Sequence, residues 1–184
     1  RCCQHGYLNR ENVQVIYNGI AIEEYRAWDK EVVRKKYQLP LNKRIIMFSA
    51  NGIKNPYKGF AYLRMALQAC QEKEEYALLV VGNKKNDRID LPFEVYDMGY
   101  IAEANVMNEI YAAADLFILP SMADVFPFTM LESMASGTPV LAFATGGIPE
   151  VVTKETGWLV PEGDSNALAN KIKEIFLYGK NSFI

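Results

Sequence analysis

The stretch DLFILPSMADVFPFTMLESMASGTPVLAFATGGIPE, residues Asp115–Glu150, decides the fold that the sequence predicts. Its first apolar run, Leu116–Leu119, has the length and composition of a strand buried on both faces. From Thr129 onward the apolar residues recur at helical spacing, and Gly137 stands where such a helix would end. These residues therefore predict a buried strand, a polar loop and a helix in succession.

The same order begins again in the second half of this stretch. Val140–Ala142 reads as the next strand, and Gly146-Gly147 follows it in front of a second possible helix start. In an open α/β sheet, the loops and helix N-termini that follow strands line the crevice where ligands bind. A helix N-terminus offers unpaired N–H groups and a partial positive charge, which suits a phosphate. We therefore expect a site for an anion that also carries hydroxyl groups.

The rest of the chain shows a similar alternation of short apolar runs and amphipathic segments. Strands that alternate with helices of about 10 to 15 residues indicate repeated β-α units and a parallel sheet. Right-handed crossovers would place the loops after the strands along one rim. The predicted fold is therefore α/β, a Rossmann-like parallel sheet flanked by helices. Further strands are expected at 13–17, 44–49, 76–81, 93–98 and 156–160, and helices at 23–37, 60–70, 103–114 and 167–177.

Length and composition limit the kind of protein. The 184 residues, half of them hydrophobic, suffice for one domain with a packed core. A net charge of −2 and a pI near 5.6 argue against a nucleic-acid-binding surface. No apolar run reaches the roughly 18 residues of a membrane-spanning helix. A single packed globular domain fits these limits.

Metal-ligating side chains are too few for a metal site to be expected. The chain has three cysteines, Cys2, Cys3 and Cys70, and a single histidine, His5, with no Cys-x-x-Cys pair. Adjacent cysteines cannot readily bridge each other, and this set lacks the spacing of zinc ligands. We expect reduced thiols, as in a cytoplasmic protein, and no metal.

Four features would meet on the predicted rim. They are Lys58-Gly59 at a helix start, Asp124 after a strand, Glu132 on the following helix, and Gly146-Gly147 after the next strand. Lysine binds phosphate as a point charge, and a carboxylate accepts hydrogen bonds from a ribose diol. Each feature also has an ordinary interpretation, as a solvated turn, an exposed helix residue or a tight turn. Their order on successive strand ends is what favours a ligand site.

Eight motifs in this order resemble the C-terminal, nucleotide-sugar-binding half of the GT-B glycosyltransferases, specifically glycosyltransferase family 4. Together they span nearly the whole chain, and the combination is specific although each piece alone is not. They are VIYNGI (15–20), YKG (57–59), LLVVGN (78–83), MGYI (98–101), YAAADLFILPS (111–121), DVFPFTMLESMASGTPV (124–140), GGIPEVV (146–152) and GWLVPEGD (157–164).

The resemblance implies roles for individual residues. Glu132 would bind the ribose hydroxyls, Asp124 would face the donor sugar, and Lys58 would neutralise the phosphates, so these three form the implied catalytic set. The backbone of Phe128, Thr129 and Met130 would meet the diphosphate and sugar, and the loop at Gly99, Tyr100 and Ile101 would lie against the base. The full set of implied nucleotide-binding residues is Gly59, Gly82, Asn83, Gly99, Tyr100, Ile101, Phe128, Thr129, Met130, Leu131, Gly146 and Gly147.

The resemblance also implies a reaction. The family transfers a sugar from a nucleoside diphosphate with retention of configuration, and needs neither metal nor cofactor because cations and helix N-termini stabilise the leaving diphosphate. The acceptor, a saccharide or lipid-linked saccharide, would bind an N-terminal domain that we expect to be missing. Residues 1–20 would be an interdomain linker and 21–184 the donor domain, inactive alone. The protein would be cytoplasmic, with the whole enzyme able to associate with the membrane face.

This sequence departs from the family pattern at three places. Asp124 is one methylene shorter than the usual glutamate, and Val125 and Pro127 replace the glycines that normally flank the aromatic residue. Pro127 has no N–H to offer a ligand. Gly52 stands near the place of a usual arginine, and Lys54, which could substitute, is out of register with that place. A weaker phosphate clamp or a different donor geometry would follow.

Other functions remain open at this point. The departures would also fit a non-catalytic nucleotide-sugar-binding domain. A nucleotide-sugar epimerase would use the same fold, whereas a phosphorylase would need a lysine for pyridoxal phosphate, and the surroundings of Glu132 do not resemble such a pocket. An unrelated flavodoxin-like binding module is disfavoured by the paired rim motifs. The sugar, the base and the acceptor are not determined by the sequence.

Overall fold

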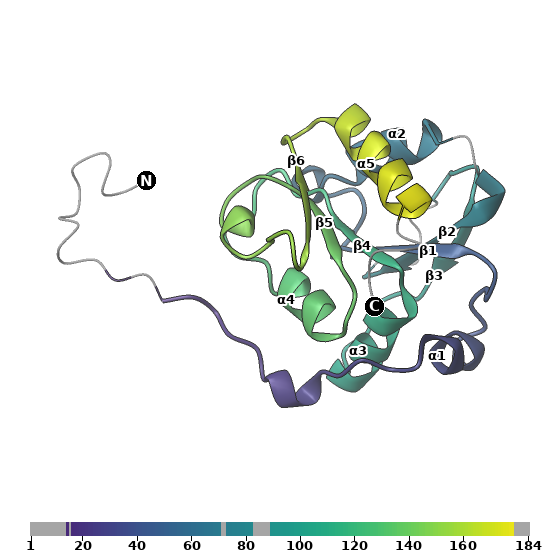
Figure 1. Ribbon diagram of the computed structural model, residues 1–184, viewed down its shortest axis with the longest axis horizontal. Coiled ribbons are helices and arrows are strands. Elements are labelled where there is room, and N and C mark those ends of the chain that lie inside the picture. Colours follow the sequence, from purple (N-terminus) through teal and green to yellow (C-terminus); the bar gives the residue numbers. More distant parts are fainter. Residues whose placement is uncertain (1–13, 15, 71–72, 83–88, 179–184) are drawn as a thin grey trace.

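The computed structural model describes residues 14, 16–70, 73–82 and 89–178. In this part of the chain a single sheet forms the centre, with six strands in the order β3-β2-β1-β4-β5-β6, all paired in parallel (Figure 1). The predicted Rossmann-like parallel sheet is confirmed. The strands are β1 (Arg44–Ser49), β2 (Tyr76–Val81), β3 (Glu94–Asp97), β4 (Leu116–Leu119), β5 (Val140–Phe143) and β6 (Gly157–Val160).

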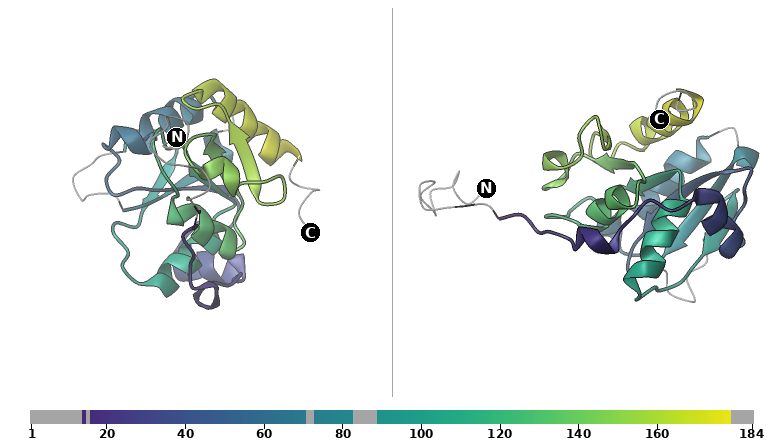
Figure 2. Two further views of the ribbon diagram at one scale, coloured as in Figure 1. Left: turned by 90° about the vertical axis from the view of Figure 1, so that its left-hand side faces the viewer. Right: turned by 60° about the horizontal axis from the view of Figure 1, so that its bottom comes forward.

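Among the described residues, five α-helices cover the two faces of the sheet. Helices α2 and α5 pack together on one face, and α1, α3 and α4 cover the other, as the left view in Figure 2 shows. None of the helices in the described ranges is long and apolar enough to cross a bilayer. The helices are α1 (Lys30–Lys36), α2 (Phe60–Gln68), α3 (Ala104–Ala113), α4 (Phe128–Ala135) and α5 (Ser165–Tyr178).

The central strands are apolar on both sides because helices cover both faces. In β1, Ile46 and Phe48 belong to the core under α2 and α5, whereas Ile45 and Met47 belong to the core under α1, α3 and α4. Side chains alternate between the two faces of a strand, so a continuous apolar run is what a doubly covered strand requires. This explains why the bounds of β1, β2 and β4 match the predicted ones.

The strand order places the crevice of the sheet between β1 and β4. From β1 the chain builds outward through β2 and β3, and then returns to the other side of β1 with β4. Loops that leave β1 and β4 at their carboxyl ends therefore run in opposite directions. Such a switch point is where ligands bind in open parallel sheets.

The segment before the sheet differs from the prediction. Gln14, Ile16 and Tyr17 are not in a strand, and Ile16 is 84% exposed, whereas residues 13 and 15 of the strand predicted at 13–17 lie outside the described residues. The helix predicted at 23–37 is two pieces, a 3-10 turn at Ile22–Glu24 and helix α1. Helix α1 begins anew because the Asp29 side chain caps it by accepting the Val32 N–H at 3.0 Å.

Smaller differences lie at the ends of other elements. The second helix start expected after Gly146-Gly147 is only a 3-10 turn, Ile148–Glu150. The last helix begins two residues earlier than predicted, at Ser165, because the Asp164 carboxylate accepts the Ala167 N–H at 2.8 Å. Helix boundaries depend on such caps, which the apolar periodicity does not include.

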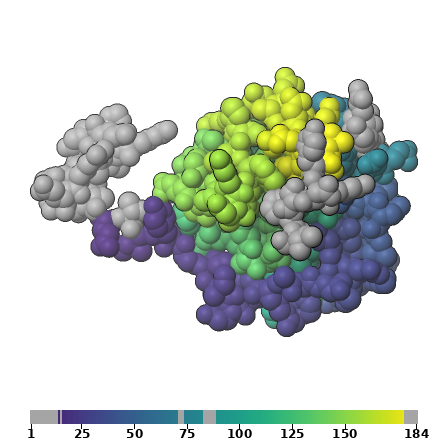
Figure 3. All heavy atoms as spheres, viewed as in Figure 1, coloured from purple at the N-terminus to yellow at the C-terminus, as the bar shows by residue number. Residues whose placement is uncertain are grey.

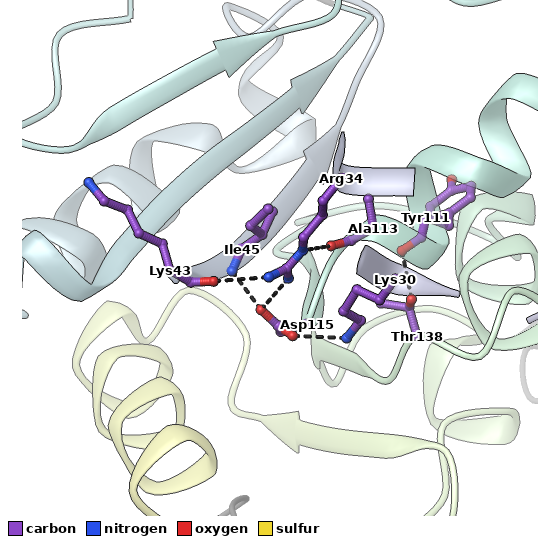
Figure 4. Close-up of polar contacts among 8 residues, drawn as sticks. All are labelled: Lys30, Arg34, Lys43, Ile45, Tyr111, Ala113, Asp115 and Thr138. Atoms are coloured by element: carbon purple, nitrogen blue, oxygen red, sulfur yellow. Dashed lines mark hydrogen bonds and ion pairs between the residues drawn. The ribbon is translucent and has the colours of Figure 1, made fainter. Parts of the chain in front are cut away.

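An ion-pair cluster ties α1 to the amino ends of β1 and β4 (Figure 4). Asp115 accepts from Arg34 Nη2 at 2.7 Å, from Lys30 Nζ at 2.8 Å and from the Ile45 N–H at 2.8 Å. The Arg34 side chain, almost fully buried, also donates from Nε to the Ala113 carbonyl oxygen at 2.9 Å. The cluster lies at the opposite edge from the strand-end loops and is therefore structural.

Candidate functional site

Lys58 and Asp124 meet across the switch point. Lys58 ends the 3-10 turn Pro56–Lys58 after β1, and its Nζ lies 2.8 Å from Oδ2 of Asp124, which follows β4. Both side chains are partly shielded from water, with 31% and 18% of their surfaces exposed. Two residues that the sequence placed on the same rim are thus in direct contact, although their roles toward a ligand remain predictions.

Glycines allow the rim loops to cross at very short range. A side chain on Gly59 would place its Cβ 1.7 Å from the Pro120 carbonyl oxygen, and one on Gly146 would place it 1.7 Å from that of Asp124. Both glycines have positive φ angles, +71° and +56°. Gly147 is also tied to this frame, since its N–H donates to the Val125 carbonyl at 2.9 Å. The packing of loops on each other accounts for glycine here, and contact with a ligand stays a prediction.

Glu132 lines a pocket of about 300 Å³ beside the carboxyl ends of β1 and β2. The structure brings it together there with Gly82, Tyr100 and Ile101, three of the residues implied for nucleotide binding. Gly99 borders this group, and its carbonyl accepts the Gly82 N–H at 2.7 Å. The other lining residues were not anticipated from the sequence: Tyr25, Ser49, Ala50, Asn51, Val81, Ala102, Ala104 and Met107.

Two tyrosines surround the Glu132 carboxylate. The fully buried Tyr111, on α3, donates its hydroxyl to Oε2 of Glu132 at 3.0 Å, and burial, then the Glu132 charge, raises the pKa of that phenol well above its usual value. Tyr25 precedes α1, and burial, then the charge of Glu132 and a hydrogen bond to it, raises its pKa to about 12. Both phenols therefore stay protonated donors at neutral pH.

Helix α4 presents its N-terminus at the same rim. Pro127 occupies the N-cap position, where a backbone N–H is not needed for the helix, so the N–H groups of Phe128 and Thr129 are the first donors of the helix. Met130 is fully buried and Leu131 packs against the same core, so their side chains serve the fold. Only the backbone of Met130 could meet a ligand, whereas the Leu131 side chain is partly exposed.

Three further residues named in the sequence analysis are Asn83, Gly52 and Lys54. Asn83 lies outside the described residues. Gly52, near the place of the missing arginine, is buried in a tight turn with φ +88°, and its N–H donates to the Gly82 carbonyl at 3.0 Å. Lys54 is exposed on this loop. The turn after β1 is therefore hydrogen-bonded to the loop after β2 through Gly52 and Gly82.

Two larger hollows, of about 490 and 720 Å³, lie at the opposite edge of the sheet. Both include Asp115, Arg44 and Phe176. Size alone does not mark a functional site, and the predicted residues converge on the smaller pocket. Within the described ranges, His, Cys, Asp and Glu form no group of three that could hold a metal ion.

Known proteins with similar sequences are glycosyltransferases. The family model described as glycosyl transferases group 1 matches residues 43–177. An uncharacterized glycosyltransferase of Methanocaldococcus jannaschii is 27% identical over 83% of the chain, and a D-inositol 3-phosphate glycosyltransferase of Mycobacteroides abscessus is 26% identical over 90%. The chain spans 42% and 39% of the lengths of these two relatives.

Solved structures with a similar fold include glycosyltransferases, and the chain covers about half the length of two of them. HepE of Anabaena, in complex with UDP, superposes with a TM-score of 0.81 and 27% identity, over 97% of this chain and 51% of its own. Sucrose-phosphate synthase of Thermosynechococcus elongatus gives 0.77 and 27%, over 91% and 44%. A C-terminal domain from Francisella tularensis, 22% identical, shares the fold with a TM-score of 0.71 over 90% of its length.

The parallel sheet, the crevice beside β1 and these superpositions show that the chain has the Rossmann-like fold found in glycosyltransferases of the GT-B type. The chain belongs to the glycosyl transferases group 1 family.

Proposed function

We propose that the chain is the donor-binding half of a retaining, metal-independent glycosyltransferase. The enzyme would move a sugar from a nucleoside-diphosphate sugar to a saccharide or lipid-linked saccharide, with no bound cofactor. The observation that carries the proposal is the position of Glu132. Glu132 lines one pocket with Gly82 and Tyr100, at the switch point of the sheet. The structurally similar protein HepE was solved in complex with UDP and with UDP-glucose.

The pocket would hold the nucleoside. Glu132 offers carboxylate oxygens to a ribose diol, and the exposed ring of Tyr100 offers an apolar surface to the base. Gly82 lets the loops after β1 and β2 form one wall of the pocket, since its φ is +83° and a Cβ there would stand 2.4 Å from the Ala50 carbonyl oxygen. A nucleoside bound in this way would direct its phosphates toward the switch point.

The switch point would hold the diphosphate and the sugar. Breaking the bond between the sugar and the phosphate leaves extra negative charge on the diphosphate. Lys58 and the first N–H groups of α4 are fixed donors that would stabilise this charge without a metal ion. Asp124, in contact with Lys58, would accept hydrogen bonds from hydroxyls of the sugar.

Titration of the chain with UDP, GDP and ADP tests donor binding. Thermal shifts and calorimetry would compare the wild type with Glu132→Gln and Lys58→Ala. We expect one nucleotide to bind, and each variant to weaken it by about 10-fold or more, since a hydrogen bond to a charged group is lost. Glu155→Gln and Lys154→Ala, in the turn before β6, are matched controls that should bind normally.

Two results would contradict the donor site. One is the absence of binding by all three nucleotides at millimolar concentration. The other is binding that Glu132→Gln and Lys58→Ala leave unchanged. Retention and metal independence are tested on the full-length protein, by the anomeric configuration of the product in NMR and by activity after treatment with EDTA. An inverted product, or activity that only Mg²⁺ or Mn²⁺ restores, would overturn those parts of the proposal.

A further inference from the structure

Glu132 is held by contacts that its own helix does not provide. It lies in the second turn of α4 and is partly buried, facing the pocket of about 300 Å³. A carboxylate in such surroundings needs hydrogen-bond donors, because burial removes water from its oxygens. Tyr111 donates a hydrogen bond to it, and Tyr25 lines the same pocket, where the Glu132 charge helps to raise the pKa of the Tyr25 phenol.

Tyr111 is fixed on all sides. Its ring is fully buried and stands edge-on to Phe117, with centroids 5.4 Å apart. Its carbonyl oxygen accepts the Thr138 hydroxyl at 2.7 Å (Figure 4). The fold has already ordered this ring, so the phenol donates to Oε2 of Glu132 at little further cost in conformational entropy.

Tyr25 is fixed through the segment that carries it. The N–H of Arg26 and the indole N–H of Trp28 both donate to Oδ1 of Asn108, at 3.3 and 2.7 Å. Asn108 lies on α3, three residues before Tyr111. Helix α3 therefore carries Tyr111 and, through Asn108, holds the segment that carries Tyr25. Figure 3 shows the amino-terminal segment, in purple, lying along the surface beside the green part of the molecule that includes α4.

The two phenols thus approach the carboxylate from inside the protein and from the rim of the pocket. A carboxylate has about four lone-pair positions, so two tyrosines leave acceptor positions for a bound ligand. A diol needs two acceptors in a defined plane, and an unrestrained glutamate side chain would lose entropy on binding it. Prior fixing of the carboxylate reduces that loss.

We propose that Tyr111 and Tyr25 are positioning residues that hold Glu132 for the ribose 2′- and 3′-hydroxyls, and so determine a preference for ribonucleotides over deoxyribonucleotides. The inference rests on the proposed donor site. It adds to that site a specificity that depends on phenolic hydroxyls which do not touch the ligand's reacting atoms.

The test compares UDP, GDP and ADP with their 2′-deoxy counterparts by calorimetry. Tyr25→Phe and Tyr111→Phe keep the rings and remove only the hydroxyls. We expect each to weaken the ribonucleotide by about 3- to 10-fold, the value of one hydrogen bond, and to leave the deoxynucleotide nearly unchanged. Tyr25 is only partly buried, so Tyr25→Phe remains informative if Tyr111→Phe folds poorly.

Tyr37→Phe is the matched control. Tyr37 donates its hydroxyl to Oε2 of Glu109 at 2.6 Å, the same chemistry away from the pocket. It should leave both affinities unchanged. Equal losses for ribo- and deoxynucleotides in Tyr25→Phe and Tyr111→Phe would show that the phenols are merely structural and would overturn the inference.

Glu132→Gln separates this inference from the function on which it rests. If Glu132→Gln abolishes the ribonucleotide preference and the tyrosine variants retain it, the inference alone is wrong. If Glu132→Gln leaves the preference unchanged, the assignment of Glu132 to the ribose fails, and the inference fails with it.

Discussion

At the scale of single residues, Asp124 would compete with a bound phosphate for the charge of Lys58. Asp124 neutralises the cation that a diphosphate would need, with Nζ and Oδ2 2.8 Å apart. A bound phosphate would also lie near the Asp124 carboxylate, which repels it. The charge of Asp124 should therefore weaken the binding of a nucleoside diphosphate that carries no sugar.

Asp124→Asn should tighten the binding of a nucleoside diphosphate by about 2- to 5-fold, because it removes this competition from a partly exposed pair. Lys58→Ala should weaken it. Calorimetry at low and high salt measures the affinity of both variants. The difference in affinity between each variant and the wild type should shrink at high salt. Glu155→Gln serves as the control at a distance. Weaker binding by Asp124→Asn would contradict the idea of competition.

A second prediction concerns Gly59. An alanine there would combine a left-handed backbone with a Cβ 1.7 Å from the Pro120 carbonyl oxygen. Gly99 has a similar φ of +63° with no atom within 4 Å of its Cβ position, so it isolates the backbone effect. Gly99→Ala should cost about 1 to 2 kcal/mol and Gly59→Ala about 1 to 3 kcal/mol more, measured by urea unfolding. Equal losses would show that the loops can separate freely.

Residue types and their order made the rim predictable, but contacts between distant residues were not. Lys58, Asp124 and Glu132 could be placed because each follows a recognisable strand end. Tyr111 stood in a quoted motif without a role, since a hydrogen bond to a residue 21 positions away has no local signal. Tyr25 was assigned to a helix that does not form there. Hydrogen-bond partners that only tertiary packing brings together could therefore not be predicted from the sequence.

At the scale of elements, the Asp115 cluster determines how α1 is attached. Burial raises the pKa of Asp115, but the charges of Lys30 and Arg34 and hydrogen bonds from Lys30 and the Ile45 N–H outweigh it, so the pKa is lowered. A group whose pKa is lower in the folded protein stabilises the fold above its ordinary value of 3.8. That stabilisation is lost as the pH falls through the folded pKa.

Asp115→Asn should therefore destabilise the protein at neutral pH by about 3 kcal/mol, since it leaves the buried Arg34 without its counter-ion. The difference from the wild type should narrow below pH 3.8. Urea unfolding over a pH series measures it. Glu31→Gln, in an exposed pair with Lys35, is the control and should have no measurable effect. A difference that stays constant at low pH would contradict the role of charge.

Elements were predicted best where burial fixes them. The continuous apolar runs of β1, β2 and β4 gave correct bounds because both faces of each strand are covered. The helix predicted at 23–37 failed because its charged amphipathic pattern does not reveal that residues 25–28 form no helix and that Arg26 and Trp28 donate to Asn108. Aspartate is a common N-cap residue, yet the sequence pattern predicted one helix through Asp29, because tertiary contacts select this cap over a longer helix.

At the scale of the whole molecule, Asn108 joins the amino-terminal segment to the rest of the fold. It is 2% exposed, accepts from Arg26 and Trp28, and donates to the Arg26 carbonyl at 3.0 Å and the Ser136 hydroxyl at 2.8 Å. Beyond it, Tyr17 packs against Phe126 and donates to Glu150. The segment thus depends on this side chain for its position beside α3 and α4.

Asn108→Ala should cost about 1 to 3 kcal/mol, because buried partners lose their hydrogen bonds. It should also speed hydrogen exchange of the amides at 25–28, while those of β1 and β2 keep their protection. Hydrogen exchange followed by mass spectrometry makes this comparison within one sample. Unchanged exchange at 25–28 would show that the segment is held by other contacts.

The crossing of the loops after β4 and β5 has a consequence for how this protein can evolve. The carbonyl oxygens of Asp124 and Val125 occupy the space where side chains on Gly146 and Gly147 would stand. A mutation that reshapes one loop is therefore tolerated only with a matching change in the other, so the two are inherited as a pair. Glu132 and Tyr111 belong to helices outside this pair. Under the proposed roles of Asp124 toward the sugar and of Glu132 toward the ribose, a lineage could change the sugar of the donor while it keeps the nucleotide.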